Sequence, residues 1–200
     1  MPTKYRNSVY MYILSLIPVL IVTPPRLGCG LIMIVLLNLI MILGTTIRFF
    51  MTKIDTGNTD RVVLLSFLIF FTIIYKRLIM LFSPILAMLL SFALFFIPIS
   101  PICLDLLFKN DNYSSPKVFG TNMLSSGIFS LHMFLFFIFR EILAYGSISI
   151  PVKSGIKALV FIPVSSSFWA TLPGTFVLLA LILAIIIFVD QKLDVIRRTK

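Results

Sequence analysis

The stretch LGCGLIMIVLLNLIMILGTTI, residues 27–47, decides the fold class of this chain. It contains no charged residue, and its one carboxamide side chain is that of Asn38. A helix needs about 20 consecutive apolar residues to cross the hydrocarbon core of a bilayer. The run Leu27–Ile47 therefore predicts a membrane-spanning helix.

The remainder of the chain has the same apolar character. Of its 200 residues, 60% are hydrophobic and only 12% are charged, whereas roughly a quarter of the residues in a soluble domain are charged. So few polar residues cannot cover a water-soluble globule, and the short polar stretches leave no room for a soluble catalytic domain. We expect a single polytopic membrane domain over residues 1–200.

Five further apolar runs are candidates for membrane spans. We therefore predict an all-α integral membrane protein with about six transmembrane helices. The third of the six runs is expected to end at Lys76-Arg77, with residues 78–82 as a weak continuation. The five runs are Val9–Val22, Val62–Tyr75, Ile85–Leu104, Met123–Phe139 and Leu172–Val189.

A mixed segment, Ile142–Thr171, separates the last two runs. Ser, Gly, Lys and Pro interrupt it so often that we do not expect it to span the bilayer. It is predicted to lie at the membrane interface, with Trp169 at the depth of the lipid headgroups, where tryptophan is enriched.

The basic residues lie mainly between apolar runs and at the chain ends, where Lys and Arg anchor helices to lipid headgroups. The net charge of +10 therefore indicates a lipid bilayer and not nucleic acid as a partner, because no soluble basic face is available. In a six-span arrangement, the two termini and the second and fourth loops lie on one side of the membrane and together hold eleven Lys and Arg. The other three loops hold six. This bias predicts that both termini lie in the cytoplasm.

A faint internal repeat relates the two halves of the chain. Pro18 interrupts the first apolar run, and Pro98 interrupts the fourth. The first repeat covers residues of about 8–82, and the second covers about 84–190. Equivalent positions are three spans apart, and this odd number of spans inverts the second copy in the membrane. Interrupted helices at matching positions of inverted repeats indicate a site near the membrane midplane. Proline is also common in membrane helices, so a chance match is the alternative.

Several short motifs, taken in order, resemble a known family. They are similar to motifs of the RnfE/NqrD family, whose members are membrane components of the Rnf electron-transport complex and of the sodium-translocating NADH:quinone reductase (Nqr). The match extends over nearly the whole chain. The motifs are LSLIPVLIVT (Leu14–Thr23), LGCGL (Leu27–Leu31), IR (Ile47–Arg48), FIPI (Phe96–Ile99), REILAYG (Arg140–Gly146) and LPGTF (Leu172–Phe176).

This resemblance implies a fold and a function. It implies six helices in two inverted three-helix repeats, with short proline-interrupted helices opening each half. It also implies a noncatalytic subunit of a multi-subunit complex in the bacterial inner membrane, which couples electron flow to ion movement. Its partners would be the other subunits, including a homologous membrane subunit of opposite orientation. The alternative is a small-solute transporter or substrate-binding membrane component without a redox role.

The resemblance also implies a shared iron–sulfur cluster, held by a cysteine from each half of the family fold. Here Ile17 occupies the first of those cysteine positions, and isoleucine cannot ligate iron. Cys103 lies near the second position and is the candidate ligand, whereas Cys29 begins the second run and is not one. Two interpretations follow: a divergent copy that lost the cluster, or a protein that shares the fold and does something else.

Polar residues within the apolar runs are further candidates for an ion path. His132 marks either such a path or a neutral histidine bonded to a neighbouring helix. Arg140 and Glu141 either bear on ion coupling as an ion pair or anchor the end of a helix. Asn38 either hydrogen-bonds across helices or marks a polar path. Arg48 ends the long span of the first half, as Arg140 does in the second.

Sequence motifs for catalysis are not found. The chain contains no Walker loop, no G-x-G-x-x-G and no H-E-x-x-H pattern, and no pairing of a nucleophile with a base. The sequence therefore predicts no catalytic residue.

Overall fold

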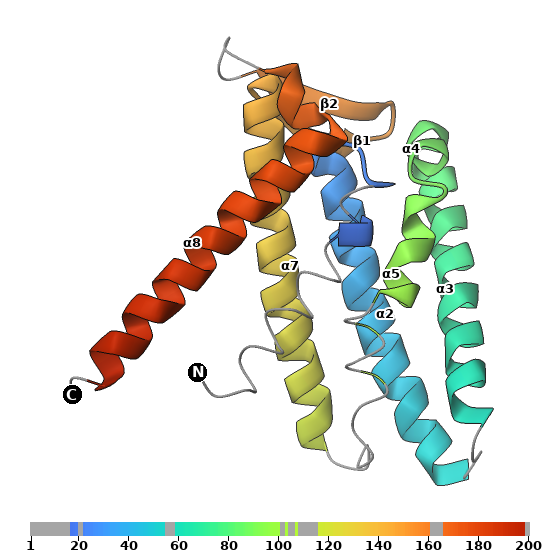
Figure 1. Ribbon diagram of the computed structural model, residues 1–200. Coiled ribbons are helices and arrows are strands. Elements are labelled where there is room, and N and C mark those ends of the chain that lie inside the picture. Colours follow the sequence, from blue (N-terminus) through green and yellow to red (C-terminus); the bar gives the residue numbers. More distant parts are fainter. Residues whose placement is uncertain are drawn as a thin grey trace.

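The computed structural model describes residues 17–19, 22–54, 59–100, 103, 107, 116–160 and 166–198 (Figure 1). Within these residues the protein is mostly helical. Its elements in chain order are α2 (Leu27–Ile54), α3 (Asp60–Phe82), α4 (Pro84–Leu89), the 3-10 helix η2 (Ala93–Phe95), α5 (Phe96–Ile99), α7 (Pro116–Tyr145), β1 (Ser147–Val152), β2 (Gly155–Val160), the 3-10 helix η3 (Ser167–Ala170) and α8 (Leu172–Arg198).

Helices α2 and α7 lie side by side at the centre of the protein (Figure 1). They are antiparallel, because Leu27 at the start of α2 bonds Glu141 near the end of α7. Gly30 of α2 lies against the ring of Phe137, so the two backbones approach closely where the glycine has no side chain. The large buried side chains of the two helices include Met33, Leu36, Leu37, Ile40, Met41, Phe129, Met133 and Phe137.

Helix α3 packs against α2 and presents an apolar surface on its other side. The Tyr75 hydroxyl donates a hydrogen bond to the carbonyl of Ile32 in α2, at 2.9 Å. A contiguous apolar surface of this kind is a usual mark of contact with membrane or another protein. The exposed large side chains of α3 are Val62, Phe67, Ile69, Phe70, Ile73, Ile74, Leu78, Met80, Leu81 and Phe82.

Three described helices are long and apolar enough to cross a membrane: Leu27–Met51, Asp60–Phe82 and Val118–Tyr145. They contain the second, third and fifth of the predicted runs. A shorter apolar helix over Leu172–Ile185 lies within the sixth. Of the first run, Val9–Val22, residues 9–16 and 20–21 lie outside the described part of the chain.

The third run continues past its predicted end at Lys76-Arg77, over residues 78–82 that were expected as a weak continuation. Helix α3 continues through Lys76 and Arg77 and ends at Phe82. Lys and Arg are good helix formers whose long side chains reach polar surroundings from within an apolar segment, so they need not end a helix. The end is set by Ser83 and Pro84, because Ser83 is extended and caps the next helix.

The fourth run, Ile85–Leu104, is not one helix over its described residues. Helix α4 ends at Leu89, residues 90–92 form a turn, and the chain resumes as η2 and α5. The prediction placed the interruption near Pro98 and Pro101. Pro98 lies buried inside the short helix α5, which ends at Ile99, and Pro101 lies outside the described residues. A further break comes before Pro98, and Ser91 lies at it.

A β-hairpin corrects the prediction of an all-α protein. Strands β1 and β2 pair antiparallel within the segment Ile142–Thr171, with Ser147 opposite Val160 and Val152 opposite Gly155. Alternating Ser and β-branched Ile favour a strand in β1. Gly146, with φ 61°, ends α7, and Gly155, with φ 119°, follows the two-residue turn. The hairpin lies across one end of α2 and α7 (Figure 1).

Candidate functional site

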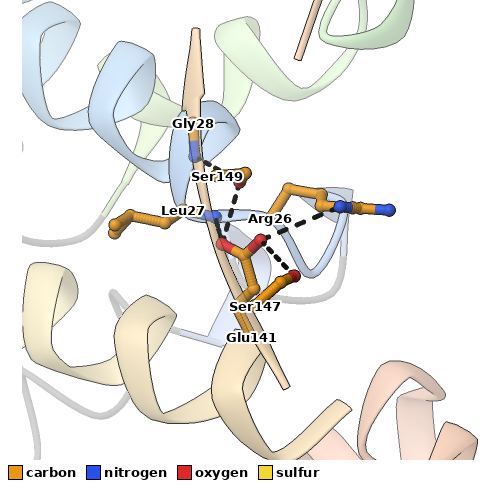
Figure 2. A network of polar contacts seen from close by, with 6 residues as sticks. All are labelled: Arg26, Leu27, Gly28, Glu141, Ser147 and Ser149. Carbon is orange, nitrogen blue, oxygen red and sulfur yellow. Dashed lines mark hydrogen bonds and ion pairs between the residues drawn. The ribbon is translucent and has the colours of Figure 1, made fainter. Parts of the chain in front are cut away.

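The candidate site surrounds Glu141 in the last turn of α7, where the carboxylate faces the N-terminus of α2 (Figure 2). The Glu141 side chain is 0% exposed. The backbone N–H of Leu27 donates a hydrogen bond to Oε2 of Glu141 at 2.6 Å. Leu27 is the first residue of α2, so its N–H has no partner within the helix, and a carboxylate also complements the helix dipole there.

The hairpin supplies two further donors to Glu141 from β1. Ser149 Oγ donates to Oε2 at 2.8 Å, and Ser147 Oγ donates to Oε1 at 3.4 Å. Residues two apart on a strand face the same side, which is why both serines reach one carboxylate. The N–H of Gly28 donates in turn to Ser149 Oγ at 3.1 Å. The network thus joins α7, the hairpin and α2 (Figure 2).

Arg26 completes the network from the segment before α2. Its Nη1 lies 3.8 Å from Oε1 of Glu141, and the Arg26 side chain is 32% exposed. The Arg26 guanidinium carbon lies 4.3 Å from the centre of the Tyr145 ring, a cation–π contact. Arg26 therefore balances the charge of the buried carboxylate from the solvent side of the site.

Arg140 joins a different pair of segments, although it is adjacent to Glu141. Its Nη1 donates to the carbonyl of Thr23 at 3.3 Å, and its Nη2 donates to the carbonyl of Ala170 at 3.4 Å. Consecutive residues of a helix point in directions about 100° apart, because a turn takes 3.6 residues. Arg140 consequently reaches η3 while Glu141 reaches β1. The ion-pair partner that the structure gives Glu141 is Arg26.

Asn38 lies at the α2–α7 interface within a second polar cluster. Its Nδ2 donates to Ser130 Oγ at 2.8 Å and to the carbonyl of Ile34 at 2.9 Å, while Ser126 Oγ donates to its Oδ1 at 2.9 Å. Two helical turns further along α2, Asn122 Nδ2 lies 3.5 Å from Thr45 Oγ1. These bonds fix the register of the two central helices.

The other predicted residues are spread over the protein. Arg48 Nη1 lies 3.3 Å from Asp60 Oδ2 and joins α2 to α3. His132 is exposed on α7, with Nδ1 2.8 Å from the carbonyl of Ile128. Pro18 is half-buried in the helical residues 17–19, and Pro98 is buried in α5. None of these residues contacts the Glu141 network through a described hydrogen bond.

The residues at the predicted cluster positions do not fit an iron–sulfur cluster of the family's kind. Ile17 packs its hydrocarbon side chain against the core, and cluster iron is held by thiolates. Cys103 is buried, and so is Cys29. Among the described residues, no three His, Cys, Asp or Glu side chains are gathered in one place.

Sequence reasoning missed Arg26, Ser147 and Ser149 as members of the site. It also missed Lys76, whose Nζ donates to Ser91 Oγ at 2.5 Å at the break between α4 and η2. A lysine inside an apolar run was the available signal, since charged residues in membrane helices usually have a specific partner. No equivalent signal marked the two serines.

The described contacts of Glu141 hold three segments of the chain together. Each carboxylate oxygen has two described polar contacts, and all the donors belong to the chain itself. A comparison with the models of known protein families and with curated proteins gives no match for this chain. The function must therefore be argued from the residues and their geometry.

Proposed function

We propose that this chain is a noncatalytic membrane subunit of an ion-translocating electron-transport complex of the Rnf/Nqr type, in the bacterial inner membrane. Its role is to scaffold the complex and to line part of the ion or electron path. The observation that carries the proposal is the meeting of three separate motif segments at the Arg140–Glu141 pair, with Ala170, just before a fourth motif, as a further contact.

Two other motifs supply a contact to that pair, and a third contact comes from a residue next to LPGTF. Thr23, at the end of LSLIPVLIVT, accepts from Arg140, and Leu27, which opens LGCGL, donates to Glu141. REILAYG contains the pair itself. Ala170, which accepts from Arg140, lies two residues before LPGTF. Motifs selected only by their likeness to one family thus occupy one buried cluster, which supports a common fold.

Two features support six spans in inverted repeats. Helices α2 and α7 hold equivalent places in the two proposed halves, and they run antiparallel as an inverted repeat requires. A short helical segment precedes each of them, residues 17–19 before α2 and the broken α4–η2–α5 series before α7. In this arrangement both termini face the cytoplasm and the hairpin faces the other side.

The outer surface supports a protein surrounded by lipid and by other membrane subunits. Exposed large apolar side chains cover α3 and recur along α7, from Leu124 to Leu143. His132 lies on the same exposed side of α7. A polar ring is costly against lipid, so this side suits a neighbouring subunit, such as the homologous one of opposite orientation. No step through an iron–sulfur cluster is proposed, because Ile17 replaces a ligand.

A small-solute transporter is the second candidate, and the break between α4 and η2 is the observation that favours it. Discontinuous helices commonly build substrate sites in membrane transporters. Lys76 Nζ reaches Ser91 at this break and lies 6.0 Å from the centre of the Phe95 ring. A cation beside unwound backbone suits an anionic solute, and this function would need no redox partner.

Mild-detergent purification of the tagged chain from its native membrane separates the two candidates. The proposed function predicts that flavin-bearing and iron–sulfur subunits copurify, with their absorbance in the visible range. Recovery of the chain alone, or with an ATPase pair, would favour the transporter and contradict the electron-transport complex. The variant Arg140→Gln is a useful companion, because it should weaken retention of the partners if the cluster supports the docking surface.

A further inference from the structure

The end of the protein that carries the hairpin is strongly basic. Its one described acidic residue is Glu141, which is buried and already paired with Arg26. Little negative charge is therefore left there to balance the remaining basic side chains. Within the described ranges, the basic residues of this end are Arg26, Arg140, Lys153 and Lys157.

The two lysines of the hairpin lie on its exposed part. Lys153 occupies the two-residue turn and Lys157 lies on β2, and both are exposed. Neither lysine forms a hydrogen bond or an ion pair with another described residue. Their charges therefore face outward and are available to a negatively charged partner.

Large apolar side chains accompany Lys157 on the same face of the hairpin. Ser147 and Ser149 point to the buried network. Of the residues that alternate with them on β1, Ile148 packs against the core and Ile150 is exposed. Ile150, which is 49% exposed, lies opposite Lys157, and Leu159, which is 47% exposed, is two residues further along β2. The outer face thus combines exposed apolar side chains with positive charge.

An aromatic pair lies at the same end of the protein. Phe168 and Trp169 of η3 stack edge to face with ring centres 5.3 Å apart, and Phe168 is exposed. η3 is held against the end of α7 by the bond from Arg140 to Ala170. Exposed aromatic rings beside basic residues are typical of the boundary between headgroups and acyl chains.

We propose that the outer face of the β1–β2 hairpin binds anionic phospholipid. Lys153 and Lys157 contact the phosphate groups, while Ile150 and Leu159 enter the acyl boundary. An acidic soluble protein would match the charge, but it would not require apolar side chains beside the lysines at the end of membrane-spanning helices. The inference rests on the membrane location proposed above and not on the redox partners.

A lipid titration of the purified full chain tests this proposal. The chain in an uncharged detergent is titrated with phosphatidylglycerol or with phosphatidylcholine, and bound lipid is counted by native mass spectrometry. The double variant K153Q/K157Q should lose phosphatidylglycerol affinity by roughly fivefold for each lysine, with phosphatidylcholine binding unchanged. The matched control R61Q/K192Q removes two basic residues from the ends of α3 and α8 that lie away from the hairpin, and it should lose less phosphatidylglycerol affinity than K153Q/K157Q.

The outcomes that overturn the proposal are distinct. Equal phosphatidylglycerol binding by the wild type and K153Q/K157Q would exclude the hairpin, and loss of an acidic protein from the complex would then assign the face to that protein. If the double variant fails to fold, the single variants K153Q and K157Q decide, because each should lose roughly fivefold in phosphatidylglycerol affinity and an unchanged affinity would exclude the hairpin. If the chain is purified from its native membrane without redox subunits, the proposed complex is contradicted. The result of the lipid titration does not depend on that outcome.

Discussion

The backbone N–H of Leu27 donates a 2.6 Å hydrogen bond to the carboxylate of Glu141, although 114 residues separate the two in sequence. This contact joins the start of one central helix to the end of the other. It also lies within a network to which the hairpin contributes two serines. Glu141 is therefore the residue that holds the start of α2, the end of α7 and the hairpin together.

Replacing Glu141 with alanine should destabilise the protein strongly. The change leaves the N–H of Leu27 and two serine hydroxyls without their acceptor and removes the partner of Arg26. Each buried donor that is left without its acceptor costs about 1–3 kcal/mol. The midpoint of thermal unfolding in mild detergent, followed by Trp169 fluorescence, measures the effect. Arg26→Gln is the control and should cost less than Glu141→Ala, because the carboxylate keeps its three hydrogen bonds and Arg26 is partly exposed. Equal effects of the two changes would contradict the account.

Replacing Arg140 with lysine should release η3 without unfolding the central helices. Lysine keeps the charge but lacks the planar guanidinium, whose two Nη atoms donate to the carbonyls of Thr23 and Ala170. Trp169 is adjacent to Ala170 and packs against the core. Its emission should therefore shift to longer wavelength while helical circular dichroism is retained. An unchanged emission spectrum would show that Arg140 does not hold η3.

Asn38 and Ser130 should be coupled across the central helices. Hydrogen bonds between membrane helices contribute about 0.6 kcal/mol on average and about 1.7 kcal/mol at most. A double-mutant cycle with Asn38→Leu and Ser130→Ala should give a coupling energy in this range, because Asn38 donates directly to Ser130. Ser66→Ala is a suitable control, since the Ser66 hydroxyl bonds only within α3 among the described contacts. If the effects of the two substitutions are fully additive, the Asn38–Ser130 hydrogen bond does not contribute to stability.

Gly30 and Gly127 give a matched pair of substitutions. A Cβ added at Gly30 would overlap the buried ring of Phe137, whereas one at Gly127 meets no atom within 4 Å. Gly30→Ala should therefore destabilise the protein by about 1–3 kcal/mol through overpacking. Gly127→Ala should stabilise it by about 0.5–1 kcal/mol, because alanine is the better helix former. Thermal unfolding of the two variants side by side is the measurement, and the same sign for both would contradict the α2–α7 packing.

The helices of spanning length could be predicted from composition. An uncharged apolar run such as Leu27–Ile47 permits little else, because every backbone group must be bonded within the segment. The ends were harder to place. Lys76 and Arg77 looked like a helix end, yet α3 continues to Phe82 because Ser83 and Pro84 set the boundary.

The hairpin and the polar network could not be predicted in the same way. The alternation of serine and isoleucine in β1 covers only a few residues, and proline and lysine nearby suggested an irregular segment. The partners of Glu141 lie far away in sequence, so no local pattern identifies Arg26 or Leu27. Arg140 and Glu141 were expected either to form an ion pair or to anchor a helix end with side chains that face different ways, and in the structure each joins different segments.

The topology of the chain tests the central claim of a six-span membrane protein most directly. Three variants, Thr3→Cys, Ser154→Cys and Thr199→Cys, each add one cysteine, near the first residue, in the hairpin and near the last residue. A membrane-impermeant maleimide is applied to sealed right-side-out and inverted vesicles. We predict that the cysteines at positions 3 and 199 react only in inverted vesicles and the cysteine at position 154 only in right-side-out vesicles. Reaction of the two terminal cysteines from opposite sides, or of all three from one side, would contradict the claim.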